Sequence, residues 1–233
     1  MLFLAVDTSG KNGSIALARV TPERSELDVL EVVPLDGGAF SAQLVPQIAA
    51  LLGKHGFSKS DLAAFAVASG PGSFTGLRVG LAAVKALAEA LQKPIVAISR
   101  LEAVARGSTT HGRVLAALDA GRGDVYVGDY EIDEGLLLIS DVTPTRRHSE
   151  RLATREEFVA EARANIVVTP DGGLAEAARA AGNRVELIAY PDSAVIARLG
   201  WEHLQRGETV RPEDLEANYL RHSDAEIFSK PAR

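Results

Sequence analysis

One pattern occurs twice in this sequence and limits the folds that the chain can adopt. It is a short apolar run that ends in an aspartate, followed by a glycine-rich turn and a second strand-like run. The first copy is Leu4–Asp7 with the turn 8–13, and the second is Ala117–Asp119 with the turn 120–123. Two copies about half the chain apart predict two similar lobes, because a solenoid needs shorter and more numerous repeats.

Strand and helix patterns alternate along the rest of the chain. We expect strands at 2–7, 14–20, 28–34, 61–69, 95–98, 114–119, 124–132 and 166–169. We expect helices at 41–53, from the loop 70–76 to about residue 92, at 174–181, and after a cap at Ser193. This order predicts an α/β fold with an amino-terminal lobe, 1–100, and a carboxy-terminal lobe, 101–233. It leaves open whether the last helix packs back on the first lobe.

Composition and charge narrow the functional classes. The chain of 233 residues is long enough for two lobes with their own cores. It has no apolar stretch of membrane-spanning length and no basic leader, so we expect neither a membrane span nor a signal peptide. The absence of cysteine excludes disulfides and thiolate chemistry and fits a cytoplasmic protein. The net charge of -6 argues against tight, independent binding to nucleic acid.

Asp7 and Asp119 each end a strand at one of the two turns, and they have two interpretations. As a pair facing a cleft between the lobes, their carboxylates could orient a nucleotide-bound metal ion or a water molecule. As turn residues, they would accept hydrogen bonds from their own downstream backbone. The residues alone favour the turn interpretation, and the two aspartates stay the only candidates for cofactor binding.

The loop 70–76 reads G-x-G-x-x-x-G, which is one residue too long for a dinucleotide fingerprint and is not a P-loop. Such a turn could hold an anion at the start of the next helix, but we favour glycines that let the chain turn and the helix pack closely. The five histidines are far apart, and no H-E-x-x-H, H-x-x-x-H or G-x-S-x-G occurs. We therefore expect neither a metal site nor a Ser–His–Asp hydrolase.

The helix that ends near residue 92 is apolar over most of its circumference. Its first stripe is made of Leu77, Leu81, Val84, Ala88 and Leu91. Its second stripe holds mainly small residues, namely Gly76, Gly80, Ala83, Leu87 and Ala90. A helix on one face of a sheet needs a single apolar stripe, so the second indicates burial on another side. Either another part of this chain or a second protein covers it.

Four segments together resemble the TsaB (YeaZ) family, bacterial accessory proteins for the formation of threonylcarbamoyladenosine in tRNA. They are L-A-V-D-T-S at 4–9, S-G-P-G-S-F-T-G-L-R-V-G at 69–80, L-D-A-G-R-G-D-V-Y at 118–126 and Y-L-R at 219–221. The resemblance spans nearly the whole chain in the right order. It implies a two-lobed, actin-like fold of the sugar-kinase and Hsp70 superfamily. In this ribonuclease H-like fold the two lobes are tandem duplicates.

The resemblance also implies a non-catalytic role. In such systems the transferase TsaD, a paralogue of TsaB, moves the threonylcarbamoyl group onto the adenosine beside the anticodon, and TsaB and the ATPase TsaE are required partners. The metal-binding H-x-x-x-H of TsaD corresponds here to Arg100 and Val104, and neither side chain is a usual metal ligand. We therefore expect no catalytic residue, no metal and no cofactor, with tRNA contacted only within the complex.

In this family the helices of the amino-terminal lobe join TsaB to TsaD, or to a second copy when it is alone. The residues that we expect at this interface are Leu44, Ile48, Leu51, Phe74, Gly76, Leu77, Gly80, Leu81, Ala83, Val84 and Leu87. Gly80→Arg or Leu77→Glu should then abolish the heterodimer and leave the fold largely intact. Two rival interpretations remain: a peptidase-like or ATP-using enzyme acting through Asp7 and Asp119, and a homodimeric scaffold that binds tRNA directly.

Overall fold

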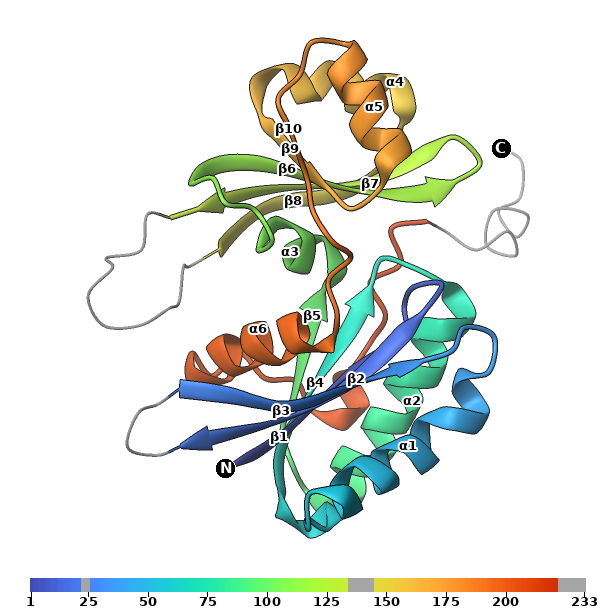
Figure 1. Cartoon of the computed structure of the whole chain (residues 1–233), viewed down its shortest axis with the longest axis vertical. Coiled ribbons are helices and arrows are strands. Elements are labelled where there is room, and N and C mark those ends of the chain that lie inside the picture. Colours follow the sequence, from blue (N-terminus) through green and yellow to red (C-terminus); the bar gives the residue numbers. More distant parts are fainter. Residues whose placement is uncertain (22–25, 134–144, 222–233) are drawn as a thin grey trace, which may run out of the picture.

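The computed structural model describes residues 1–21, 26–133 and 145–221, which form two five-stranded mixed sheets, one in each lobe (Figure 1). The first sheet has the order β3-β2-β1-β4-β5, with β1 (Leu2–Asp7), β2 (Gly13–Thr21), β3 (Glu26–Leu35), β4 (Leu62–Gly70) and β5 (Ile95–Ser99). Strand β1 runs antiparallel to β2 and parallel to β4.

The second sheet repeats this topology in the order β10-β9-β6-β7-β8. Its strands are β6 (Gly112–Gly121), β7 (Asp124–Ile132), β8 (Thr145–Thr154), β9 (Ile166–Thr169) and β10 (Val185–Leu187). Strand β6 is antiparallel to β7 and parallel to β9, as β1 is to β2 and β4. The duplication expected from the two aspartate-ended strands is therefore confirmed at the level of the whole sheet.

Six α-helices and three 3₁₀ turns complete the described residues. The helices are α1 (Phe40–Lys54), α2 (Phe74–Leu91), α3 (Arg100–Ala105), α4 (Arg155–Glu161), α5 (Gly172–Ala180) and α6 (Ser193–Gln205). The 3₁₀ turns are η1 (Lys59–Asp61), η2 (Ala162–Ala164) and η3 (Pro212–Asp214). Among the described residues, no helix combines the length and the apolar content that crossing a membrane requires.

Strand β1 has helices on both faces, and its alternating side chains divide between them. Leu2, Leu4 and Val6 belong to the core under α1 and α2. Phe3 and Ala5 point the other way and pack against α6. The last helix thus packs on the first sheet although it follows the second sheet in the chain, while the lobe boundary at residue 100 stays a prediction.

The start of α6 differs from our expectation. Asp192, not Ser193, caps the helix, because its side chain accepts a hydrogen bond from the Ala194 backbone N–H at 2.9 Å. Ser193 is fully buried, and its hydroxyl donates to the backbone oxygen of Ser14 in β2 at 2.6 Å. The serine joins α6 to the first sheet instead of capping the helix.

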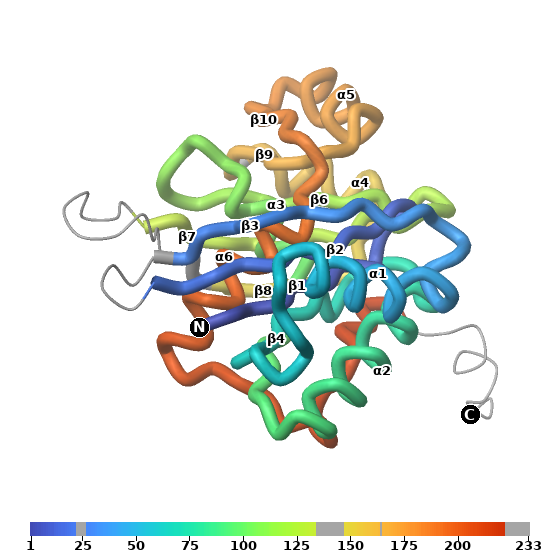
Figure 2. The backbone as a smooth tube through the Cα atoms, turned by 60° about the horizontal axis from the view of Figure 1, so that its bottom comes forward, coloured from blue at the N-terminus to red at the C-terminus, as the bar shows by residue number. Residues whose placement is uncertain are grey.

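The segment after η3 crosses from one lobe to the other, running beside α2 (Figure 2). Leu215 is buried in the core under α1 and α2, whereas Leu220 packs against the core of the second sheet. Between them, the Asn218 backbone N–H donates to the Ser69 oxygen at 2.7 Å, and its side-chain amide donates to Glu150 Oε2 at 2.6 Å. The residues after Arg221, whose contact with tRNA the sequence leaves open, lie outside the described residues.

Candidate functional site

Asp7 and Asp119 lie in one cavity between the two lobes. This cavity, which we call the aspartate cavity, has a volume of about 570 Å³. Asp7 enters it from the end of β1 and Asp119 from the equivalent place in β6, because the duplicated sheets bring corresponding strand ends to the same gap. Arg100 and Asp171 also line it.

The hydrogen bonds of the two aspartates are those of turn residues. Asp7 Oδ1 accepts the backbone N–H of Ser9 at 2.8 Å and also the Ser9 hydroxyl. Asp119 Oδ1 accepts the backbone N–H of Gly121 at 3.0 Å. The turn interpretation thus describes the local geometry, and a cofactor-binding role stays a prediction.

Asp171 is a third carboxylate of this cavity that we did not expect. Its Oδ2 accepts the Asp119 backbone N–H at 2.8 Å, and its Oδ1 accepts the Tyr190 hydroxyl. Burial raises the pKa of Asp171, and repulsion by Asp119 adds to this, against the backbone hydrogen bond and Arg100. The sequence carried a signal for it, since Asp-Gly-Gly at 171–173 again follows a strand.

The effect of the Asp119 charge on the pKa of Asp171 can be measured by titration. Asp119→Asn removes the like charge but keeps the backbone donor, so the pKa of Asp171 should fall in a carbon-detected NMR titration. Arg100→Gln should move the same pKa upward. Because the pKa of Asp171 is raised on folding, this group makes the wild-type fold less stable as the pH rises above its unfolded-state pKa. No change in either variant would show that the two charges are screened from Asp171.

The two positions that correspond to the metal-binding histidines of TsaD lie in different surroundings. One Arg100 guanidinium nitrogen donates weakly to the backbone oxygens of Ser9 and Pro71, each at 3.4 Å. Val104 is buried in the core of the second lobe and does not line the aspartate cavity. Within the described part of the chain, no group of three or more histidine, aspartate or glutamate side chains is placed to hold a metal ion.

The glycines of loop 70–76 allow a close approach between backbones. A Cβ at Gly72 would lie 2.3 Å from the Ser9 backbone oxygen, and one at Gly76 would lie 2.0 Å from that of Thr8. The Ser73 N–H donates to the same Ser9 oxygen at 2.7 Å. These contacts support the packing interpretation of the loop, because they leave no room for side chains between the turn after β1 and the start of α2.

Most of the residues that we expected at a partner interface belong to the core of this chain. Eight of the eleven are buried, namely Leu44, Ile48, Leu51, Gly76, Leu77, Gly80, Leu81 and Val84. A Cβ at Gly80 would lie 2.3 Å from Thr8 Oγ1, so this glycine makes room for the turn after β1 and not for another helix. Gly80→Arg and Leu77→Glu should therefore damage the fold, contrary to the expectation from the sequence.

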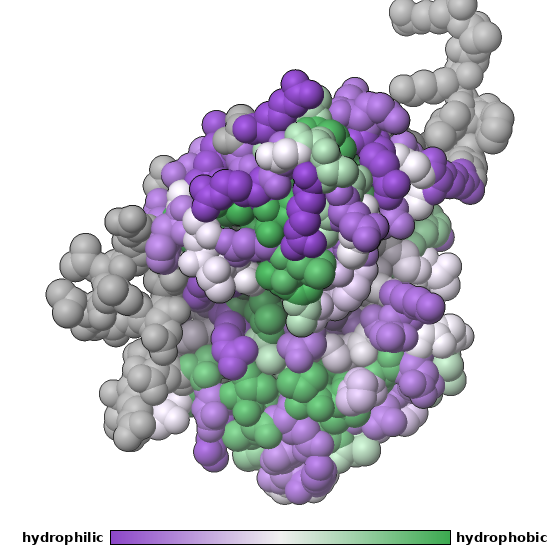
Figure 3. Space-filling view, turned by 45° about the horizontal axis from the view of Figure 1, so that its top comes forward, coloured by the Kyte–Doolittle hydropathy of each residue, from purple (hydrophilic) through white to green (hydrophobic). Residues whose placement is uncertain are grey.

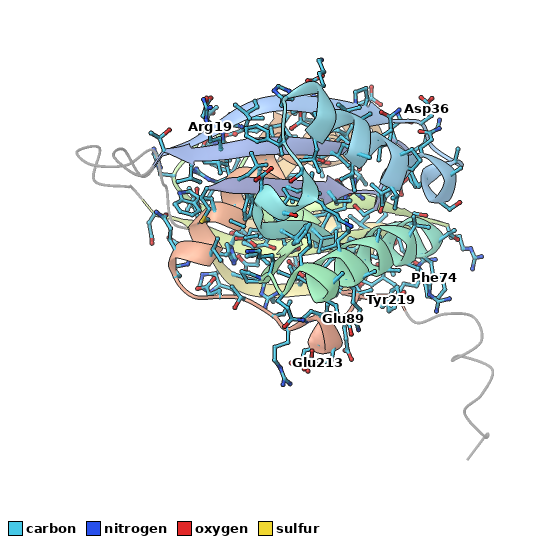
Figure 4. The ribbon with its side chains drawn as sticks, turned by 90° about the horizontal axis from the view of Figure 1, so that it is seen from below. Arg19, Asp36, Phe74, Glu89, Glu213 and Tyr219 are labelled. Atoms are coloured by element: carbon cyan, nitrogen blue, oxygen red, sulfur yellow. The ribbon has the colours of Figure 1, made fainter. Side chains whose placement is uncertain are left out.

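The opposite sides of α1 and α2 are exposed and carry small apolar residues. On α1 these residues are Ala42, Val45, Ala49 and Ala50, and on α2 they are Ala82, Ala86 and Ala90, with Val79, Ala83 and Leu87 half-buried beside them. We call this surface the alanine face. The two helices contact each other and lie side by side (Figures 2 and 4). Of the expected residues, Ala83, Leu87 and the exposed Phe74 remain accessible.

The surface of the two lobes differs in hydropathy in the view of Figure 3. Hydrophilic residues cover most of the upper lobe, whereas hydrophobic residues gather on the visible face of the lower lobe. The lower lobe holds the first sheet (Figure 1). On this face, therefore, exposed apolar surface belongs mainly to the lobe that also carries α1 and α2.

Comparisons with known proteins agree on one group. A family model described as TsaD, tRNA N6-adenosine threonylcarbamoyltransferase, matches residues 33–171. The tRNA threonylcarbamoyladenosine biosynthesis protein TsaB of Bacillus subtilis is 37% identical over 138 residues, which span 59% of this chain and 58% of that protein. Its Escherichia coli namesake is 29% identical over 232 residues, spanning 97% and 96%. The structure of YeaZ from Pseudomonas aeruginosa superposes with a TM-score of 0.75 at 28% identity, covering 94% of this chain and 99% of that one.

Proposed function

Because the chain belongs to the TsaB (YeaZ) family, we propose that it acts in threonylcarbamoyladenosine formation as a non-catalytic subunit that binds and activates a TsaD-type transferase. The transferase would carry the reaction on the adenosine next to the anticodon, in tRNAs that read codons beginning with A. A TsaE-type ATPase would be a further partner, and tight binding of whole tRNA would require the complex. The site of action would be the cytoplasm.

The observation that carries this proposal is the alanine face. Alanines at positions 82, 86 and 90 follow one side of α2 at helical spacing, and Ala42, Val45 and Ala49 do so on α1. Small side chains let the backbones of two helix pairs approach closely, and an exposed apolar surface gains free energy when a partner removes it from water. A paralogue with the same lobe would offer a matching pair of helices, and a second copy of this chain would do so when the transferase is absent.

Activation would follow from differential binding. A subunit that contacts no substrate can shift the transferase towards its active conformation only by binding that conformation more tightly than the others. Contact at the alanine face would provide this preference without any catalytic group from this chain. The charge of -6 fits a subunit that depends on its partner for the positive surface that tRNA requires.

The test is reconstitution with purified components. Threonylcarbamoylation of tRNA is measured with a synthase for threonylcarbamoyl-adenylate, the TsaD-type transferase and the TsaE-type ATPase, with and without this chain. We expect modification to depend on the chain and to saturate at one copy per transferase. Equal modification without it would contradict the proposal.

The alternative proposal is that the chain is an enzyme whose active site is the aspartate cavity. It rests on the three carboxylates that line this cavity. Asp7→Asn and Asp119→Asn distinguish the enzyme from the non-catalytic subunit, because neither aspartate belongs to the alanine face. A non-catalytic subunit should keep full activation of the transferase in both variants, whereas an enzyme that uses these carboxylates should lose its turnover. Loss of modification in either variant, with an unchanged fold, would favour the enzyme.

A further inference from the structure

A second cavity lies between the lobes, beside the aspartate cavity. It has a volume of about 430 Å³, within the range of about 300–1,000 Å³ that is typical of small-molecule sites. Its walls are the start of α2 with Phe74, the turn 120–122 with Tyr126, and the segment 218–221. We call it the aromatic cavity, because three of its lining residues are Phe74, Tyr126 and Tyr219.

Two of these rings form an exposed stack that is already assembled. The ring centroids of Phe74 and Tyr219 are 4.9 Å apart, and their planes are tilted by 33°. The Arg78 guanidinium carbon lies 3.8 Å from the Phe74 centroid, and its Nε donates weakly to the Tyr219 hydroxyl at 3.4 Å. The two rings remain 39% and 40% exposed, and Figure 4 shows them together at one end of α2. Residue 74 and residue 219 are brought together only by the fold.

The cavity also has arginines on its other wall. Arg122 is exposed and has a φ of 58°, between two glycines that also have positive φ, so the turn presents its side chain at the cavity. One Arg221 guanidinium nitrogen donates to Asp124 Oδ2 at 2.6 Å and to the Gly121 oxygen at 3.1 Å. Arg221 Nε is buried and finds no acceptor among the residues that the structure describes.

We propose that the aromatic cavity binds a nucleotide. The base would stack on the exposed ring of Tyr219, and the phosphate oxygens would face the guanidinium groups of Arg122 and Arg221. Aromatic rings accept any base because every base has a π-face, and guanidinium groups match phosphate geometry. The nucleotide could be free in solution or could be an unpaired residue of an RNA loop, whose bases are recognised in the same way.

The segment that carries Tyr219 is held in place by hydrogen bonds to both lobes. Asn218, which precedes the stacked Tyr219, is hydrogen-bonded to β4 through its backbone and to Glu150 of β8 through its side chain. Arg78 holds the tyrosine from the side of α2. A preformed stack loses little side-chain entropy on binding, which favours measurable affinity for a small ligand.

The proposal is tested on the chain alone, so it stands apart from the proposed activation of the transferase. Isothermal titration calorimetry and ligand-detected NMR are carried out with AMP, with ATP and with a synthetic anticodon stem-loop RNA. Binding of AMP or ATP identifies a free nucleotide as the source, and binding of the stem-loop only identifies RNA. If none of the three probes binds at millimolar concentration, the proposal is wrong, whatever the reconstitution assay gives.

Matched variants locate the bound probe. Tyr219→Ala should weaken binding at least about fivefold, since one base–aromatic stack contributes about 1–3 kcal/mol. Tyr219→Phe, which keeps the ring, should restore most of it. Arg122→Ala should weaken binding of ATP more than binding of AMP, which carries fewer phosphate charges. Arg179→Ala, the same change at an exposed position of α5, should have no effect. Wild-type affinity in both Tyr219→Ala and Arg122→Ala, with unchanged thermal unfolding, would place the ligand elsewhere.

Discussion

Gly76→Ala is expected to lower the free energy of unfolding by about 3 kcal/mol, although it adds one methyl group to a helix. That methyl would lie 2.0 Å from the Thr8 backbone oxygen, so α2 and the end of β1 must move apart. The same movement weakens the bond from the Thr8 hydroxyl to the Gly76 oxygen, now 2.7 Å, in a buried place. For a chain of this size the midpoint of thermal unfolding should fall by about 6–12 °C.

Gly53→Ala is the matched control. Gly53 lies in the last turn of α1, where an added Cβ would meet nothing within 4 Å. Alanine is the better helix former, so this variant should gain up to about 1 kcal/mol. Calorimetric unfolding of the two variants tests the close approach directly. If Gly76→Ala is tolerated as well as Gly53→Ala, β1 and α2 are not packed as described.

Ala86→Arg is expected to weaken binding of the TsaD-type transferase by at least about a hundredfold and to abolish modification in the reconstituted assay. Ala86 is exposed in the middle of the alanine face, so a long charged side chain should be accepted by the isolated chain. In a close helix contact the same side chain would clash and bury an unpaired charge, which costs several kcal/mol. Affinity is measured by surface plasmon resonance and folding by thermal unfolding.

Ala180→Arg provides the control for charge and size. Ala180 is exposed at the end of α5, in the other lobe, so this variant should bind the transferase as the wild type does. Each variant must also keep its thermal midpoint, which separates lost binding from lost folding. Wild-type affinity of Ala86→Arg would show that the transferase docks somewhere else.

The two-lobed fold could be predicted from the sequence because its evidence is local. The run Leu4–Asp7 and the run Ala117–Asp119 each carry a strand, a carboxylate and a turn within a few residues. The structure places them as β1 and β6 at equivalent positions of two sheets. Strands β8 and β10 and helices α3 and α4 were not predicted. Strand β8 has no apolar residue before Leu152 and is held at a sheet edge by pairing with β7.

The orientation of α2 could not be predicted, for a different physical reason. Periodicity shows that a helix has two apolar stripes, but not which one the sheet covers. Here the first sheet covers the stripe with Leu77. The glycines of the second stripe are buried as well, because Thr8, in the turn after β1, lies against them. To assign the buried and the exposed side of α2, one must know which residues face Gly76 and Gly80, and the sequence pattern does not give this. Asp171 was missed similarly, since its approach to Asp119 depends on the pairing of β9 with β6.

The crossing of residues 215–221 between the lobes has a consequence for motion. Leu215 is anchored in one core and Leu220 in the other, with Asn218 bonded to both sheets between them. Rotation of one lobe about a hinge would stretch this short tether, which spans only a few residues. The opening angle of the cleft is thereby restricted, in contrast to proteins whose domains close freely around a ligand. A molecule that binds the tether should therefore stiffen the whole protein and not only the place where it binds.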